Sequence, residues 1–109
     1  MRALALLLAA VLTCATGAAA AGAARKPATV QIKMDGMKFV PAEAAVHSGD
    51  TIVWTNTDVV AHTVTSKTGL FDSKLIPPGG TWKYVAKKAG SFDYKCSYHL
   101  PMTATFTVR

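Results

Sequence analysis

The most informative stretch of this sequence is SFDYKCSYHLPM, residues 91–102. Its first half alternates between polar and apolar residues, which is the period of a β-strand with one buried face. On that register Phe92, Tyr94 and Cys96 share one face, and we expect that face to point inward. The cysteine sulfur should therefore face the core rather than water.

The second half of the stretch is a short loop with the spacing Cys96-x-x-His99-x-x-Met102. It joins a soft sulfur, an imidazole nitrogen and a weak thioether, which suit copper that cycles between Cu(I) and Cu(II). Magnesium and calcium prefer oxygen ligands. His62, from an upstream segment, would complete a site of two histidines and one cysteine with an axial methionine. We expect one copper ion at these four residues.

Other uses of the same residues fit less well. Structural zinc sites normally contain two or more cysteines, and iron–sulfur clusters contain more still. Cys96 and His99 could form a nucleophilic pair, but the sequence offers no orienting group and an inward sulfur would not reach a substrate. We therefore expect no enzyme. His47 lies in a Ser-Gly-Asp turn, and we interpret it as a solvated residue and not as a ligand.

The rest of the chain reads as short strands separated by turn residues. We expect strands at 30–34, 38–46 with a bulge or a sheet edge at Pro41, 51–56, 62–66, 81–85, 91–96 and from residue 103 onward. Asp-Gly, Pro-Pro-Gly-Gly and Lys-Lys-Ala-Gly segments mark turns between them, and no helix of usable length appears. This pattern predicts an all-β protein, a Greek-key β-sandwich of about eight short strands.

The first 24 residues differ from the rest. A single Arg2 precedes an apolar run and then small alanines and glycines, which predicts a secretory signal peptide at 1–24 and one domain at 25–109. We expect a periplasmic or secreted protein without stable membrane insertion. Cys14 weakly resembles a lipoprotein processing site, so a lipid anchor is a minor alternative. Cys96 then has no partner for an intrachain disulfide, and metal binding gives such a cysteine a use.

The chain is basic, with a net charge of +6, or +5 once Arg2 is removed with the leader. Its cations are dispersed and the chain is exported, which argues against nucleic-acid binding. The charge favours a redox partner protein with an acidic docking surface. We expect a monomer.

The chain resembles the cupredoxins, the small type 1 blue-copper proteins, over nearly all of residues 25–109. The matching segments are GDTIVWTN at 49–56, HTVT at 62–65, GSFDYKC at 90–96, and then His99 and Met102. The short ligand loop is more similar to that of amicyanins than to the longer loops of plastocyanins. Leu100 stands where that group usually has a proline, and Pro101 follows it.

The resemblance implies that His62, Cys96 and His99 hold copper in a plane, with Met102 as the distant axial ligand. It implies that Asn56 ties the two ligand loops together and that the Thr63 N–H bonds the Cys96 sulfur. Such surrounding bonds tune a metal site.

The resemblance also implies a one-electron carrier whose electrons leave through the exposed edge of His99. Leu100, Pro101 and Val60 would form an apolar patch around that edge for docking. The alternative is a periplasmic copper-binding protein for copper delivery or homeostasis. Met34 and Met37 give that alternative slight support as soft copper ligands, although core and strand positions explain them as well.

Overall fold

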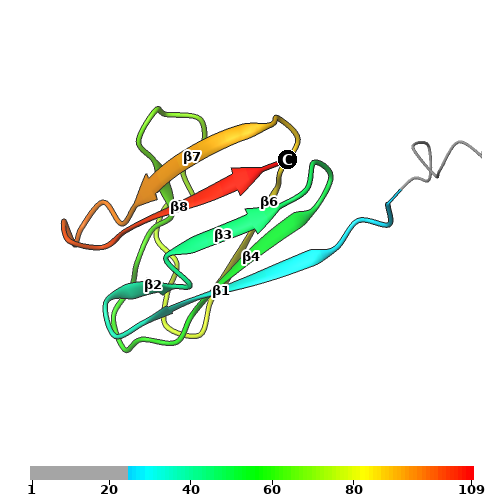
Figure 1. Ribbon diagram of the computed structural model, residues 1–109. Coiled ribbons are helices and arrows are strands. Elements are labelled where there is room, and N and C mark those ends of the chain that lie inside the picture. Colours follow the sequence, from blue (N-terminus) through cyan, green and yellow to red (C-terminus); the bar gives the residue numbers. More distant parts are fainter. Residues whose placement is uncertain (1–24) are drawn as a thin grey trace, which may run out of the picture.

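The computed structural model describes residues 25–109, which form a sandwich of two four-stranded sheets (Figure 1). The strands are β1 (Thr29–Asp35), β2 (Lys38–Val40), β3 (Glu43–Val46), β4 (Thr51–Asn56), β5 (Thr65–Ser66), β6 (Thr81–Val85), β7 (Gly90–Lys95) and β8 (Thr103–Val108). The described residues contain no helix, so the predicted all-β sandwich is confirmed. The eight strands enclose one hydrophobic core.

The first sheet has the strand order β2-β1-β4-β6. β4 is its central strand, paired in parallel with β1 and antiparallel with β6. Ile52 and Trp54 alternate onto the inner face and are fully buried, as their β-branched and aromatic side chains favour. Val53, on the other face, is also buried, because it lies between Gln31 and Lys83 on the neighbouring strands.

The second sheet has the order β3-β8-β7-β5, with β8 between β3 and β7. Tyr94, Cys96 and Phe106 all point into the core and are fully buried, as the alternation predicts. Tyr94 packs edge-on against Trp54 of the facing sheet, with 5.5 Å between ring centroids. Burial raises the pKa of Tyr94 to about 12, so this phenol stays neutral inside the core.

Two expected strands differ from the structure. The stretch 38–46 is not one strand, because it divides at Pro41, which has no N–H for a ladder, into β2 in one sheet and β3 in the other. The stretch 62–66 is a strand only at β5. Its first residues have other partners: His62 exchanges backbone bonds with Ile76, and the Thr63 N–H donates to the Cys96 sulfur.

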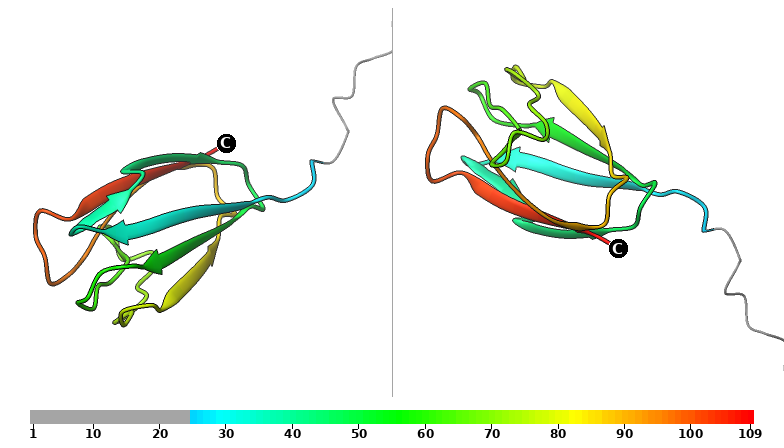
Figure 2. Two further views of the ribbon diagram at one scale, coloured as in Figure 1. Left: turned by 90° about the horizontal axis from the view of Figure 1, so that it is seen from below. Right: turned by 90° about the horizontal axis from the view of Figure 1, so that it is seen from above.

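The two ends of the sandwich are formed by different segments of the chain (Figure 2). The start of β1 and the C-terminal end of β8 lie at one end, and the 96–102 loop between β7 and β8 lies at the other. The first end is organised by the turn at 47–50. This turn forms hydrogen bonds with Ala28, Ala86 and Arg109, which come from three separate segments.

The predicted signal peptide at 1–24, together with Cys14, lies outside the described residues. Within residues 25–109, no helix is long and apolar enough to cross a membrane.

Candidate metal centre

Cys96 follows the last residue of β7 and is completely buried. Its sulfur accepts a hydrogen bond from the Thr63 N–H, with 3.4 Å between nitrogen and sulfur. This is the contact that the resemblance implies for Thr63.

His62 is fully buried and comes from the segment between β4 and β5. Its Nε2 lies 2.7 Å from Asp58 Oδ2. The Met37 N–H first, and then bonds from His62 and the Gly36 N–H, hold the pKa of Asp58 below its usual value. Asp58 is therefore an anion that accepts a hydrogen bond from Nε2–H. The other ring nitrogen of His62, Nδ1, is directed at Cys96 and His99.

His99 supplies the third donor atom and is only partly buried. The Nδ1 atoms of His62 and His99 are 3.2 Å apart, and they lie 3.8 Å and 3.4 Å from the Cys96 sulfur. A metal ion bonded to nitrogen at about 2.0 Å and to sulfur at about 2.3 Å holds such donors roughly 3.2–3.7 Å apart at angles of about 100–120°. The triangle in this structure has that size, so the donor set fits one metal ion.

Met102 closes the ligand loop. Its N–H donates to the His99 carbonyl at 2.9 Å, and its carbonyl accepts from the Cys96 N–H at 3.0 Å. Its side chain is almost completely buried. These two backbone bonds connect Met102 to both other ligand positions of the loop.

A hydroxyl network joins the loop to the segment that carries His62. The Ser97 N–H donates to Thr63 Oγ1 at 2.9 Å, and the Ser97 hydroxyl donates to Thr65 Oγ1 at 3.0 Å. Thr63 thus bonds to the ligand loop through both its backbone and its side chain. Thr63 therefore forms the link between the two ligand loops that the resemblance implies for Asn56.

Asn56 has a different role from the expected one. Its Nδ2 donates to the carbonyls of Val60 and Ile76, and its Oδ1 accepts from the Asp58 N–H. These bonds shape the loop that delivers His62 and hold it against the 76–80 segment. None of them reaches the 96–102 loop.

Sequence reasoning missed Asp58. Besides His62, its carboxylate accepts bonds from the N–H groups of Gly36 and Met37 in the turn between β1 and β2. Both turn residues have positive φ, near 60°, which presents two successive N–H groups on one side. The only sequence signal was a carboxylate four residues before His62, in a loop.

Exposed apolar side chains occur in the two loops next to His62 and His99. Leu100 is 80% exposed and Val60 is 42% exposed, and Pro101 is exposed as well. Val59, which was not predicted, is the most exposed large apolar residue within residues 25–109, at 93%. The contact between the His62 and His99 rings places the 57–61 and 96–102 loops side by side at this end.

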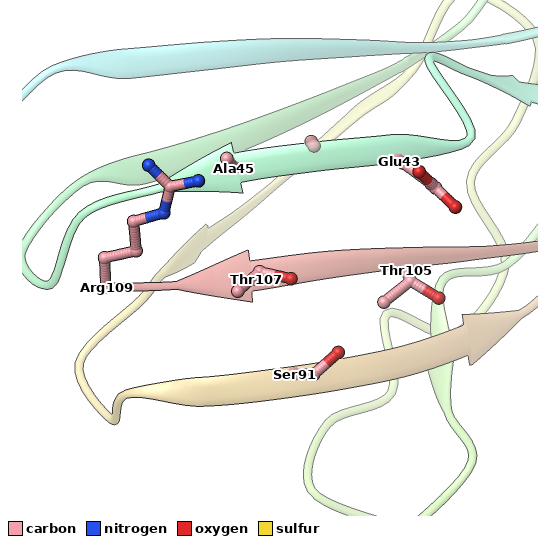
Figure 3. Close-up of a pocket in the computed structure, with 7 residues that line it drawn as sticks. Glu43, Ala45, Ser91, Thr105, Thr107 and Arg109 are labelled. Atoms are coloured by element: carbon pink, nitrogen blue, oxygen red, sulfur yellow. The ribbon is translucent and has the colours of Figure 1, made fainter.

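Other candidate positions lie elsewhere. His47 is about half exposed, lies in the 47–50 turn at the opposite end and is 4.0 Å from Asp50. A shallow hollow occupies the outer face of the β3-β8-β7 sheet, as Figure 3 shows. It is lined by Glu43, Ala44, Ala45, Ser91, Thr105, Thr107 and Arg109. These residues include no ligand of the donor cluster.

A β-sandwich that holds one buried thiolate and two imidazoles in a compact triangle defines a class, the small copper proteins with a type 1 site. Residues 4–108 match the Cupredoxin-like domain family. The chain belongs to the cupredoxin-like family.

Its relatives include amicyanins. Amicyanin-alpha of Methylorubrum extorquens is 32% identical over 109 residues, covering 91% of this chain and 92% of that protein. Amicyanin of Paracoccus versutus is 28% identical over 75 residues, covering 64% of this chain and 57% of that protein. The resemblance to the amicyanin group is therefore confirmed.

Solved structures show the same fold. The Cu(I) form of an amicyanin mutant superposes with a TM-score of 0.71 at 22% identity, over 74% of this chain and 82% of that one. A purple cupredoxin from Nitrosopumilus maritimus superposes with a TM-score of 0.67 at 26% identity, over 73% and 99%. The cofactor of the family is one type 1 copper ion, and His62, Cys96, His99 and Met102 form a ligand set for it.

Proposed function

We propose that this protein is a one-electron carrier and not an enzyme, with copper held by His62, Cys96, His99 and Met102. Bound copper supplies the redox couple, Cu(I)/Cu(II). The observation that carries the proposal is the triangle of donor atoms, 3.2–3.8 Å on a side, built from two loops joined by hydrogen bonds.

The residues around the donors support this role. The Thr63 N–H partly neutralises the sulfur charge, and Asp58 orients His62 and strengthens it as a donor. His62 and Cys96 are fully buried, whereas His99 is partly exposed. A centre that is buried except at one ligand suits electron transfer through that ligand.

We propose that electrons cross at His99, through a docking patch formed by Leu100, Pro101 and Val60, with Val59 added. Redox encounters use small, weak interfaces of this kind. We expect the acidic surface of the partner to be attracted by the net positive charge of this chain as a whole. At the copper end itself, cations and anions lie next to one another: Lys74 pairs with Asp72 at 3.5 Å, and Lys38 is the cross-strand neighbour of Asp35.

Residues 1–24 have the composition of a signal peptide, which supports a periplasmic monomer comprising residues 25–109. The proposal would be wrong if the protein isolated from a periplasmic fraction still began at Met1.

The test of the site is the visible absorption and paramagnetic resonance spectrum after one equivalent of Cu(II), compared with Cys96→Ser and with His47→Ala as the control. We expect an intense thiolate-to-copper band that disappears in Cys96→Ser and persists in His47→Ala. A weak, tetragonal-type spectrum in the wild-type protein would contradict the type 1 assignment. The colour is itself informative, because one structural neighbour is described as purple.

The test of the carrier role is His99→Gly. We expect this variant to keep its fold and admit small ligands, and to lose most of its electron exchange. Unchanged exchange with a redox partner would show that His99 is not the exit point.

One observation favours the alternative, copper delivery or homeostasis. Met34 is fully buried and belongs to the core, but Met37 is 42% exposed, and its N–H bonds to the carboxylate that holds His62. An exposed thioether near the copper end could receive Cu(I). Fast copper transfer to an acceptor, slowed by Met37→Leu, would favour this role, whereas fast self-exchange without copper loss favours the carrier.

A further inference from the structure

The positive charge of the chain is concentrated at the end opposite the ligand loop. The turn at 47–50 brings three segments together there: Ser48 donates its N–H to the Arg109 carbonyl and its hydroxyl to the Lys87 carbonyl, and Asp50 accepts from the Ala28 N–H. Each of these segments carries exposed cations. We call the group formed by Arg25, Lys26, Lys87, Lys88 and Arg109 the basic pole.

Little negative charge balances the basic pole. Within residues 25–109 the acidic residue at this end is Asp50, which is 1% exposed and already paired with Arg25 at 3.0 Å. Lys26, Lys87, Lys88 and Arg109 form no ion pair with any described residue. The pole therefore presents four unpaired cations to solvent.

At the opposite end charges of both signs lie together, as in the Lys74–Asp72 ion pair at 3.5 Å and the cross-strand pair Asp35–Lys38. The two ends are separated by the length of the sandwich, about 20 Å for the six residues of β4 at about 3.3 Å per residue. This distance exceeds the Debye length of about 8 Å at physiological salt, so the two ends act electrostatically as separate surfaces. An anionic surface attracts the basic pole and leaves the copper end free.

We propose that the basic pole docks on an anionic phospholipid surface and directs the copper end away from it. The contact is peripheral and electrostatic, and it requires no insertion of the chain. Each cation near an anionic membrane raises binding about fivefold, so two lysines account for roughly a 25-fold effect.

The experiment uses the copper-loaded protein in sedimentation with vesicles of phosphatidylglycerol and phosphatidylcholine. We expect binding at low salt that is lost at high salt and absent from pure phosphatidylcholine. Lys87→Gln with Lys88→Gln should weaken binding roughly tenfold or more. The control, Lys33→Gln with Lys83→Gln, removes the same charge from the outer face of the first sheet and should weaken binding less than about threefold.

A second double variant, Lys26→Gln with Arg109→Gln, removes charge from the basic pole without changing the turn that contains Lys87. It should weaken vesicle binding as much as the first double variant does. The visible spectrum of each variant checks that it is folded. Equal losses in the pole and control variants would show that net charge alone drives binding, and would overturn the proposal. No binding to anionic vesicles, or equal binding to neutral ones, would overturn it as well, and would leave an acidic protein as the occupant of the pole.

Discussion

Asp58 connects three parts of the molecule through one carboxylate. It accepts from His62, and from Gly36 and Met37 in the turn between β1 and β2. A carboxylate behind an imidazole makes that imidazole a stronger donor, and loss of such a partner typically weakens metal binding by about 10–100-fold. The first histidine is thereby coupled to a hairpin that contributes no ligand.

We predict that Asp58→Asn raises the reduction potential. Cu(II) depends more than Cu(I) on strong donors, so the variant destabilises the oxidised form. A loss of about 10–100-fold confined to Cu(II) corresponds to a rise of about 60–120 mV, at about 59 mV per tenfold for one electron. Voltammetry of the wild-type protein and the variant measures the difference.

Asp35→Asn is the matched control, because Asp35 ends β1 at the same end of the sandwich, is exposed and makes no side-chain contact with a ligand. It should shift the potential only slightly. An equal rise in both variants would mean that removal of negative charge is the cause, and not the bond to His62.

Much of the centre could be predicted at the residue scale. Cys96, His99 and Met102 lie within one loop, so their spacing alone indicated a common site, and the chemistry of that set indicated copper. His62 required the assumption that a distant segment folds onto the loop. Asp58 could not be predicted, because its role depends on the turn at 36–37 reaching it across space.

At the scale of the element, the turn at 47–50 has the clearest energetic role. Asp50 accepts backbone bonds from Ala28 and His47, and these bonds, followed by Arg25, lower its pKa to about 2. The carboxylate thereby fastens the lead-in before β1 to the turn before β4. The turn holds the chain where β1 and β4 begin their parallel pairing.

We predict a loss of stability in acid that originates at Asp50. Its pKa is lower in the folded than in the unfolded protein, so its contribution is complete above the ordinary value of 3.8 and is lost as pH falls toward 2. Urea midpoints of the copper-free protein, measured from about pH 5 down to about pH 2, should fall less steeply in Asp50→Asn than in the wild type. Parallel pH profiles for the two proteins would contradict this role.

The strands themselves were largely predictable from alternation and turn residues. β4, β6, β7 and β8 are at the expected places, because alternating or β-branched and aromatic residues fill them and turn residues mark their ends. The expected strand at 62–66 was wrong over most of its length. His62 and Thr63 use their backbone groups for Ile76 and for the Cys96 sulfur, and β-propensity does not encode such partners.

At the scale of the whole molecule, the sandwich separates an apolar copper end from a charged opposite end. Two copies that meet through their copper ends bring Leu100 and Val59 together with charges of both signs around them. Electron self-exchange between such copies therefore depends on contact between apolar surfaces.

We predict that Leu100→Glu slows self-exchange by about tenfold or more at low salt, because the two copies then place like charges in the contact. Line broadening in nuclear magnetic resonance spectra of mixed oxidised and reduced protein measures the rate. Val85→Glu is the control, since Val85 is 44% exposed and ends β6 away from the ligand loop. A similar decrease in both variants would place the contact elsewhere.

The position of β8 has a consequence for biosynthesis. It is the last strand in chain order, yet it lies between β3 and β7, so a chain without residues 103–108 has no partner that joins those two strands. β7 can still pair with β5, but β3 has no partner strand until β8 has been made. The second sheet is therefore completed only when residues 103–108 are available, later than the first sheet, which does not need them.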